Sequence, residues 1–327
     1  MQPKDTSGEN AVFFGVVWSA CAGCYVLDGR RLEEEMGRGF EPWTVGPVED
    51  FDPSDYGLAR GDAVPDLSFH EGVLTVLNAS AAARAFHVSV RNGQCVGLAS
   101  SLDGKGRATT TFAIALAPRT CVDLCELDGQ DPDIASDVMD IVPPVKEAEA
   151  CHFQCFPLAA TDASPAYLCT QAANGGLSHF AHAGTYYAVD FRCSPGTAVL
   201  AMDDGVVTDV HDDSRGASVH VESLFHWNSL TLHVRAGFLE YVHLARSLVR
   251  KGDHVRRGQT IALSGSAGFC PEPHLHLQLN RSPDPDAPSL PIALFSGDGP
   301  PRVPVAGEWW PGAPSDDEPS SSSSSSS

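Results

Sequence analysis

Residues 270–279 read CPEPHLHLQL, and the fold of the chain follows from this stretch outward. Leucines alternate with His274, His276 and Gln278, which is the period of a β-strand, because residues i and i+2 of a strand point to the same face. The leucines are therefore expected to face a core, and the histidines lie about 7 Å apart on the opposite face. A lone pair of this kind is more often a solvated strand face than a functional site, so its meaning depends on the rest of the sequence.

Length and composition limit the classes of protein to which the chain can belong. With 327 residues, 43% hydrophobic and 19% charged, it is long enough for two globular domains with a core in each. Its 21 lysines and arginines stand against 42 aspartates and glutamates, a formal charge of −21. This charge excludes nucleic acid and anionic membranes as expected partners, because binding to phosphate requires the opposite sign.

The cysteines and the apolar N-terminal stretch indicate no further site. Ten cysteines include a single Cys-x2-Cys pair, at Cys21 and Cys24, which is too few for a four-cysteine zinc site, and their disulfide status stays open. Residues 11–27 form a 17-residue apolar stretch, short for a membrane span, and the preceding MQPKDTSGEN lacks the basic residues of a signal peptide. We expect buried strands there and no stable membrane span.

Short alternating segments predict an all-β chain built from two β-rich modules. The segments LSFHEGVLTVLN and ARAFHVSVRNG alternate apolar and polar residues, and the second ends in a turn-forming Asn92-Gly93. Short strands at this spacing are typical of a small β-sandwich. The predicted divisions are an irregular or β segment (1–65), a β-sandwich-like module (66–128), an acidic, proline-containing linker (129–150), a second β-rich domain (151–310) and a disordered acidic and serine-rich tail (311–327).

An ordered set of motifs lies within the second β-rich domain. Ser178-His179 is followed by YYAVDF, PGTAVLAMDDGVV, YVHL, GDHVRRGQ and HLH. This set, over about residues 175–295, resembles peptidase family M23, the lysostaphin and LytM-like zinc metallopeptidases. The resemblance implies an M23-type antiparallel β-sheet domain after an N-terminal β-module. It also implies a zinc metalloendopeptidase that acts on peptidoglycan or glycine-rich peptides outside the cytoplasm.

The same resemblance implies a role for each polar residue of the motifs. His179, Asp190 and His276 would be the ligands of Zn²⁺, a set of nitrogen and oxygen donors that leaves a fourth position for water. His274, beside His276 on the strand face, would be the general base. His243, in the YVHL motif, would stabilise the developing oxyanion or donate a proton to the leaving amine.

Several alternatives remain open at this point. His182 competes with His179 as first ligand, because it precedes Asp190 by eight residues instead of eleven. Turn chemistry favours His179, since Ala183-Gly184 after His182 suggests an exposed turn. The turn at residues 270–273, where the family tends to have Gly and Ser, is expected to border the cleft. This turn and Leu277, where an aromatic residue commonly stands, leave metal binding intact but put the substrate preference of the family in doubt.

Two other functions are considered for the same motifs, a non-catalytic module and a carrier domain. A catalytically inactive M23-like binding or regulatory module is the alternative, although the presence of both candidate catalytic histidines favours an enzyme. A biotinyl or lipoyl carrier is excluded, because Lys251 lies inside the hairpin motif and is not displayed for modification. The DDGVV stretch at residues 203–207 predicts a hairpin turn with Gly205 at positive φ. The sequence does not indicate an oligomeric state.

Overall fold

The computed structural model describes residues 65–91, 95, 107–128, 132–141, 148–175, 177–214, 216–284, 286–295 and 299–314. It also gives the backbone of short strands before and between them, β1 (Val12–Phe13), β2 (Val16–Ser19), β3 (Cys24–Leu27), β4 (Arg38–Gly39), β5 (Glu49–Asp50) and β9 (Ser101–Leu102). The rest of the expected segment 1–65, and the expected serine tail beyond residue 314, lie outside the described residues. A helix of the length and apolarity needed to cross a membrane is not found in the described part of the chain.

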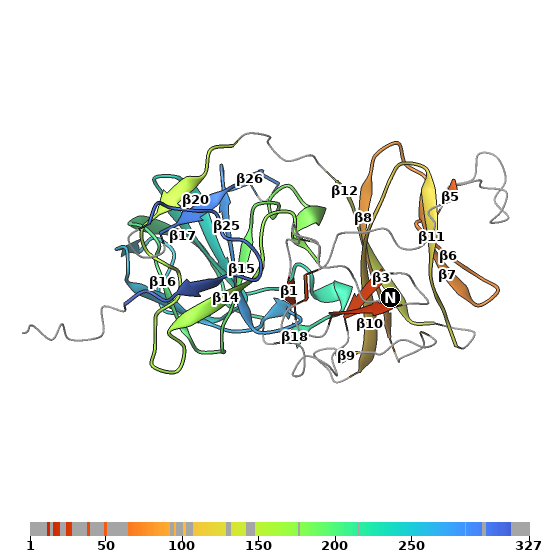
Figure 1. Cartoon of the computed structure of the whole chain (residues 1–327), viewed down its shortest axis with the longest axis horizontal. Coiled ribbons are helices and arrows are strands. Elements are labelled where there is room, and N and C mark those ends of the chain that lie inside the picture. Colours follow the sequence, from red (N-terminus) through yellow and green to blue (C-terminus); the bar gives the residue numbers. More distant parts are fainter. Residues whose placement is uncertain are drawn as a thin grey trace, which may run out of the picture.

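The described residues form two β-rich bodies that lie side by side (Figure 1). The first, here called the N-terminal sandwich, has two antiparallel four-stranded sheets, in the orders β12–β8–β10–β9 and β5–β11–β7–β6. Their remaining strands are β6 (Leu67–His70), β7 (Val73–Asn78), β8 (Arg84–Arg91), β10 (Ala108–Leu116), β11 (Thr120–Glu126) and β12 (Ile134–Asp140). Phe86, Val88, Phe112 and Leu124 are fully buried in one cluster between the sheets. The predicted all-β fold with an N-terminal sandwich is confirmed.

Strand β12 falls where the sequence was expected to form a linker. The acidic stretch 129–150 contains Ile134 and Val138, four residues apart, and both pack against the core of the sandwich. Asp137 between them and the other acids of the stretch mask this spacing in the composition. The strand pairs with β8 along its whole length, so this part of the stretch belongs to a sheet.

The second body, residues 148–314, is built on a nine-stranded sheet of order β22–β17–β19–β20–β25–β15–β14–β28, with β26 beside β25. The strands of this body are β13 (Cys151–Phe153), β14 (Ala166–Gln171), β15 (Val189–Arg192), β16 (Ala198–Leu200), β17 (Gly205–His211), β18 (Ala217–Ser218), β19 (Ser229–Val234), β20 (Gly237–Val242), β21 (Leu244–Ser247), β22 (His254–Val255), β23 (Thr260–Ser264), β24 (Gly268–Phe269), β25 (His274–Asn280), β26 (Ser289–Leu290), β27 (Ile292–Leu294) and β28 (Trp309–Pro311). Two short 3-10 helices, η2 (His179–Ala181) and η3 (Val221–Ser223), lie between them. We call this part the C-terminal body.

Strand β25 carries the HLHLQL stretch and lies inside this sheet, between β20 and β15. Its three leucines are fully buried in the main hydrophobic cluster, as the alternation predicts. In the antiparallel register, His276 stands opposite Asp190 of β15 and opposite Val242 of β20. The core therefore fixes which residues share the polar face.

Gly205 does not have the expected left-handed conformation, because its φ is not among the positive values. It begins strand β17, and a Cβ atom at this position would lie 2.8 Å from the carbonyl oxygen of His233. The glycine is therefore required by the close approach of two paired backbones. The expectation of a positive φ at Gly205 was wrong.

The YVHL motif connects two sheets. Its Tyr241 is fully buried, and the hydroxyl accepts a hydrogen bond of 2.9 Å from the backbone N–H of Met202. His243 has a positive φ of 62°, an uncommon conformation for a residue with a side chain. This bend ends β20 and directs the chain into β21 of the three-stranded sheet β16–β23–β21. The strained residue is thus held by well-packed neighbours on both sides.

We expect Tyr241→Phe to lower the free energy of unfolding by about 1–3 kcal/mol, because it leaves the buried N–H of Met202 without an acceptor. Urea unfolding followed by fluorescence measures this. Tyr186→Phe is the matched control, since the half-buried Tyr186 hydroxyl forms no hydrogen bond to a described residue, and it should change stability by less than about 0.5 kcal/mol. Equal effects of the two variants would contradict the assigned bond.

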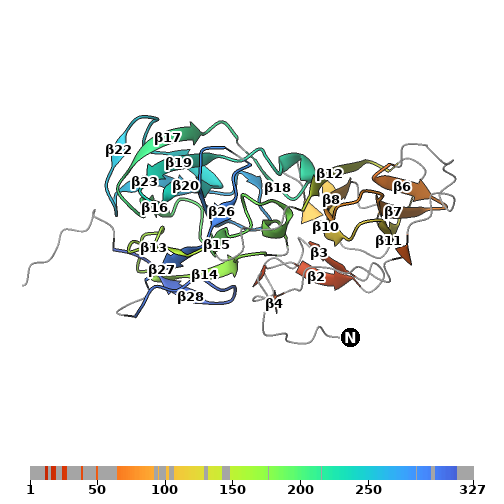
Figure 2. The same cartoon turned by 90° about the horizontal axis from the view of Figure 1, so that it is seen from above.

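The sheet β12–β8–β10 of the N-terminal sandwich faces the C-terminal body (Figure 2). All residues of β8 after Arg84 are buried, although only every second one faces the core of the sandwich. His87 Nε2 lies 2.9 Å from the Leu177 carbonyl oxygen, and Ser89 Oγ accepts a bond of 3.0 Å from the N–H of Val221. The polar face of this strand is therefore an interface.

Burial lowers the pKa of His87, more than its bond to Leu177 and the charge of Asp137 raise it. Below about pH 6.5 the unfolded chain thus binds a proton that the folded chain excludes, so stability falls with falling pH. We expect the unfolding free energy of the wild type to decrease more steeply than that of His87→Gln between about pH 7.5 and 5.5. Denaturant titrations at several pH values measure this, and parallel curves would contradict it.

Candidate metal centre

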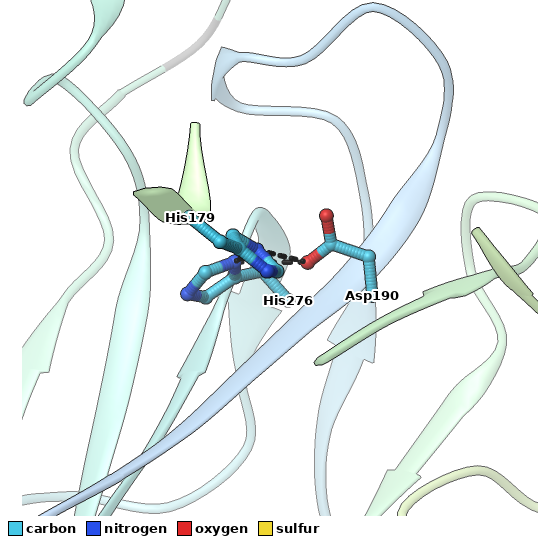
Figure 3. Close-up of side chains that lie close together, drawn as sticks. All are labelled: His179, Asp190 and His276. Atoms are coloured by element: carbon cyan, nitrogen blue, oxygen red, sulfur yellow. Dashed lines mark hydrogen bonds and ion pairs between the residues drawn. The ribbon is translucent and has the colours of Figure 1, made fainter. Parts of the chain in front are cut away.

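Three side chains from three separate elements converge at one buried point (Figure 3). His179 comes from η2, Asp190 from β15 and His276 from β25. His276 Nδ1 lies 2.9 Å from Asp190 Oδ1 and 3.1 Å from His179 Nε2, and His179 Nε2 lies 3.2 Å from the same carboxylate oxygen. One ligand-type atom from each residue lies within 4.8 Å of the others, and all three residues are buried.

The outer hydrogen bonds of the two imidazoles determine which nitrogens face this point. His179 Nδ1 donates to the Ala172 carbonyl oxygen at 3.0 Å, so Nε2 carries the lone pair. His276 Nε2 lies 3.0 Å from Gln278 Oε1, and the amide nitrogen of Gln278 donates to Glu240 Oε2 at 2.9 Å. Since that amide nitrogen can only donate, Gln278 presents oxygen to His276, whose Nε2 must donate. When the His276 ring is neutral, as a metal ligand must be, its lone pair therefore lies on Nδ1.

The charges at this point favour a cation. Burial alone would raise the pKa of Asp190, but His179, His274 and His276 around it hold that pKa well below its usual value, so the carboxylate is ionised. Burial lowers the pKa of His276, yet the adjacent Asp190 carboxylate raises it above the ordinary value. Two lone pairs and a carboxylate that face one another at this distance repel unless positive charge lies among them.

The donor set fits a zinc ion. Two imidazole nitrogens and one carboxylate oxygen are the ligand types of catalytic zinc sites, which use three protein ligands. Each imidazole also donates its second N–H to an oxygen, and the remaining carboxylate oxygen of Asp190 accepts from Gln171 Nε2 at 2.8 Å. Such outer bonds orient metal ligands and are typical of real sites.

Two further imidazoles lie beside this cluster. His274 Nδ1 donates to the Glu272 carbonyl oxygen and His243 Nδ1 to the Ala267 carbonyl oxygen, each at 2.7 Å. Their rings lie 4.5 Å apart, and His274 Nε2 is 3.7 Å from Asp190 Oδ2. Burial lowers the pKa of His274, and it holds that of His243 well below the usual value. Both rings are therefore neutral at neutral pH, with the lone pair on Nε2.

A cavity of about 1010 Å³ adjoins the cluster and is lined by His243 and His276. Its wall includes the aromatic residues Phe225, Trp227, Phe238 and Phe269 and the acidic residues Asp209, Asp213, Glu240, Asp284 and Asp286. His87 and Met139 of the N-terminal sandwich also line it. The alternation of β25 placed Gln278 on this face from sequence alone, whereas Gln171 and Glu240 gave no signal in the sequence.

His182, the competing ligand, lies outside the three-residue cluster. Its Nδ1 accepts a bond of 3.0 Å from the N–H of Gly184, and its Nε2 is 3.4 Å from Asp286 Oδ1, on the cavity wall. The backbone of residues 182–185 turns here, and the side chain is partly exposed.

The turn at residues 270–273 does not line the cavity, contrary to the expectation from sequence. Cys270 and Glu272 are buried, and Glu272 forms an ion pair with Arg192 at 3.0 Å. Among the described residues, the cavity wall includes Phe269 just before this turn, but none of its four members. Leu277 points into the core, as the alternation of β25 predicts.

Comparisons with known proteins fall on this part of the chain. Residues 184–288 match the model of peptidase family M23, a range that contains Asp190, His243, His274 and His276 and begins five residues after His179. The chain is 39% identical over 92 residues to a metalloprotease of Haemophilus influenzae, described as uncharacterized, which is 28% of this chain and 18% of that protein. It is 35% identical over 97 residues to the glycyl-glycine endopeptidase ALE-1 of Staphylococcus capitis, covering 29% and 24%.

The peptidoglycan DD-endopeptidase ShyA of Vibrio cholerae is 37% identical over 98 residues, covering 30% of this chain and 20% of that protein. The chain therefore spans no more than about a quarter of the length of these three relatives. Among solved structures, the catalytic domain of the prophage-encoded M23 protein EnpA from Enterococcus faecalis has 23% identity and a TM-score of 0.31, over 41% of this chain and 94% of that chain. Over residues 184–288, the chain carries a domain of peptidase family M23.

Proposed function

We propose that the chain is a zinc-dependent metalloendopeptidase that hydrolyses peptide bonds in peptidoglycan or in glycine-rich peptides, outside the cytoplasm. The observation that supports this most is the convergence of three acceptor atoms with two neutral imidazoles beside them. The similarity to ALE-1, a glycyl-glycine endopeptidase, and to ShyA, a peptidoglycan DD-endopeptidase, supports the substrate class.

His179 Nε2, Asp190 Oδ1 and His276 Nδ1 would hold the zinc ion. When bound, zinc supplies Lewis acidity, which lowers the pKa of water to about 7 and polarises a carbonyl group. Gln278 and Glu240 keep His276 in the tautomer that leaves Nδ1 free. The protein thus contributes the orientation of the ligands and a buried, low-dielectric surrounding.

His274 and His243 move the protons. His274 Nε2 accepts a proton from the attacking water as general base, and the Glu272 carbonyl stabilises the imidazolium through Nδ1–H. His243 is neutral with its only proton on Nδ1, which is bonded to Ala267. Its Nε2 can donate to the leaving amine only after it has received a proton, and the His274 imidazolium, whose ring lies 4.5 Å away, would supply the proton that it took from the water.

The wall of the cavity fits an extended peptide. The aromatic side chains provide apolar surface, and the five carboxylates named above exceed the single lysine of the wall, Lys251. This balance favours substrates that carry amines over anionic ones. The whole chain, with a formal charge of −21, is negative like the wall of the cavity.

We expect about one zinc ion per chain. His276→Ala and His179→Ala should weaken zinc binding by orders of magnitude, because each removes one of three ligands. His182→Ala is the matched control and should change the affinity little, since its side chain lies outside the cluster. Elemental analysis and competition with a chromophoric chelator measure this. A larger loss in His182→Ala than in His179→Ala would show that the first ligand is misassigned.

We expect His274→Ala and His243→Ala to retain zinc but to lower the rate of hydrolysis by about 10²–10⁴-fold, because each removes a proton-transfer group and no ligand. The assay incubates each protein, with and without chelator, with peptidoglycan and with oligoglycine peptides, and identifies products by mass. A wild type that binds zinc but cleaves neither substrate would support the non-catalytic binding module instead.

A further inference from the structure

The outward face of the sheet β12–β8–β10 is shaped to receive the segments that flank the metal centre. Ala85, Ala115 and Met139 contact Phe180 and Ala181 of η2 in one cluster. Ala113 and Ala135 pack against a second cluster on the C-terminal body, formed by Leu177, Val219, Val221, Leu224 and Phe269. The small side chains let η2 and η3 approach the sheet closely. The N-terminal sandwich therefore forms one of the surfaces against which η2 packs.

Helix η2 has only three residues, and it contains the first ligand, His179. A helix this short has few hydrogen bonds of its own, so its position depends on its surroundings. The peptide groups of Leu177, two residues before the ligand, are held on both sides. Its N–H donates to Gln171 Oε1 at 3.1 Å, inside the C-terminal body, and its carbonyl oxygen lies 2.9 Å from His87 Nε2 of the sandwich.

Packing alone does not account for an imidazole at position 87. His87 is fully buried, between the rings of Phe180 at 5.9 Å and Phe269 at 6.4 Å, where an apolar side chain would pack as well. Its Nδ1 has no hydrogen-bond partner among the described residues, so the bond to Leu177 is the one polar contact that repays part of the cost of burial.

We infer that the N-terminal sandwich completes the metal centre, and that His87 is a positioning residue for the ligand His179. His87 holds the Leu177 carbonyl, the Leu177 backbone sets where η2 begins, and η2 directs His179 Nε2 toward Asp190 and His276. The sandwich is thereby a structural part of the site, although it supplies no ligand. This inference rests on the zinc site proposed above.

The test compares zinc affinity among variants of the full chain. His87→Asn shortens the side chain so that its amide cannot reach Leu177, whereas His87→Gln can place an amide N–H near the position of Nε2. Ser89→Ala is the matched control, on the same strand and face, because it removes the bond to Val221 and leaves the contacts of η2 intact. If His87→Asn does not fold, His87→Leu, which retains the buried volume, replaces it.

We expect His87→Asn to weaken zinc binding about tenfold, at the low end of the effect of groups that orient metal ligands. His87→Gln should stay within about threefold of the wild type, which is under 1 kcal/mol. Ser89→Ala should lower the unfolding temperature without a change in zinc affinity. The visible absorption of the cobalt(II) form, which reports ligand geometry, should change in His87→Asn alone.

Failure of the positioning role of His87 can be told apart from failure of the metal site itself. If the wild type binds zinc but His87→Asn binds it equally well, the positioning role is overturned and the metal site stands. If His87→Asn and Ser89→Ala weaken zinc equally, the interface acts only through general stability, which also overturns the role of His87. If the wild type binds no zinc, the metal site fails, and the inference fails with it.

Discussion

The antiparallel pairing of β15 with β25 is the constraint on which the site depends. It places Asp190 directly opposite His276 on one face of the sheet, while Val189, Phe191 and the leucines of β25 enter the core on the other. Because side chains alternate between faces, a shift of register by one residue would exchange the two sets and turn the leucines of β25 away from the core. The hydrophobic core therefore holds the carboxylate and the imidazole together, and no attraction between the polar groups is required to bring them there.

A second constraint comes from the tautomers of the four imidazoles. Buried imidazoles must have hydrogen-bond partners, and here each donates one N–H outward and keeps the other nitrogen for chemistry. Three of the four outer acceptors are backbone carbonyl oxygens, those of Ala172, Ala267 and Glu272. The main-chain path thus determines the protonation pattern of the site. The exception, His276, depends on the side chains of Gln278 and Glu240.

The interface between the two bodies makes the geometry of the site depend also on residues outside the M23 domain. Alternate residues of strand β8 face the core of the sandwich, and the residues between them face η2 and η3 of the C-terminal body. Arg91 adds an ion pair with Glu222 at the end of the same strand. A single strand that serves two bodies couples their positions, because neither face can shift without disturbing the other. The cavity lined by His87 and Met139 is one consequence of this arrangement.

The sequence by itself determined the strand period of β25, the burial of its leucines, the two histidines and Gln278 on one face, and the all-β fold with its N-terminal sandwich. These properties are local or follow from an ordered set of motifs, so they can be read without knowledge of long-range contacts. The acidic stretch that contains β12 was assigned to a linker, because its charges conceal two apolar residues that pack only when β8 is present. Only the tertiary structure decided that His179 enters the cluster while His182 faces Asp286, since both lie within reach of Asp190 along the chain. It also decided that His87, Ser89 and Arg91 meet a second body and not solvent. A strand with polar residues on one face has the same sequence pattern whether that face meets solvent or another body. Which of the two it meets depends on contacts between segments about ninety or more residues apart.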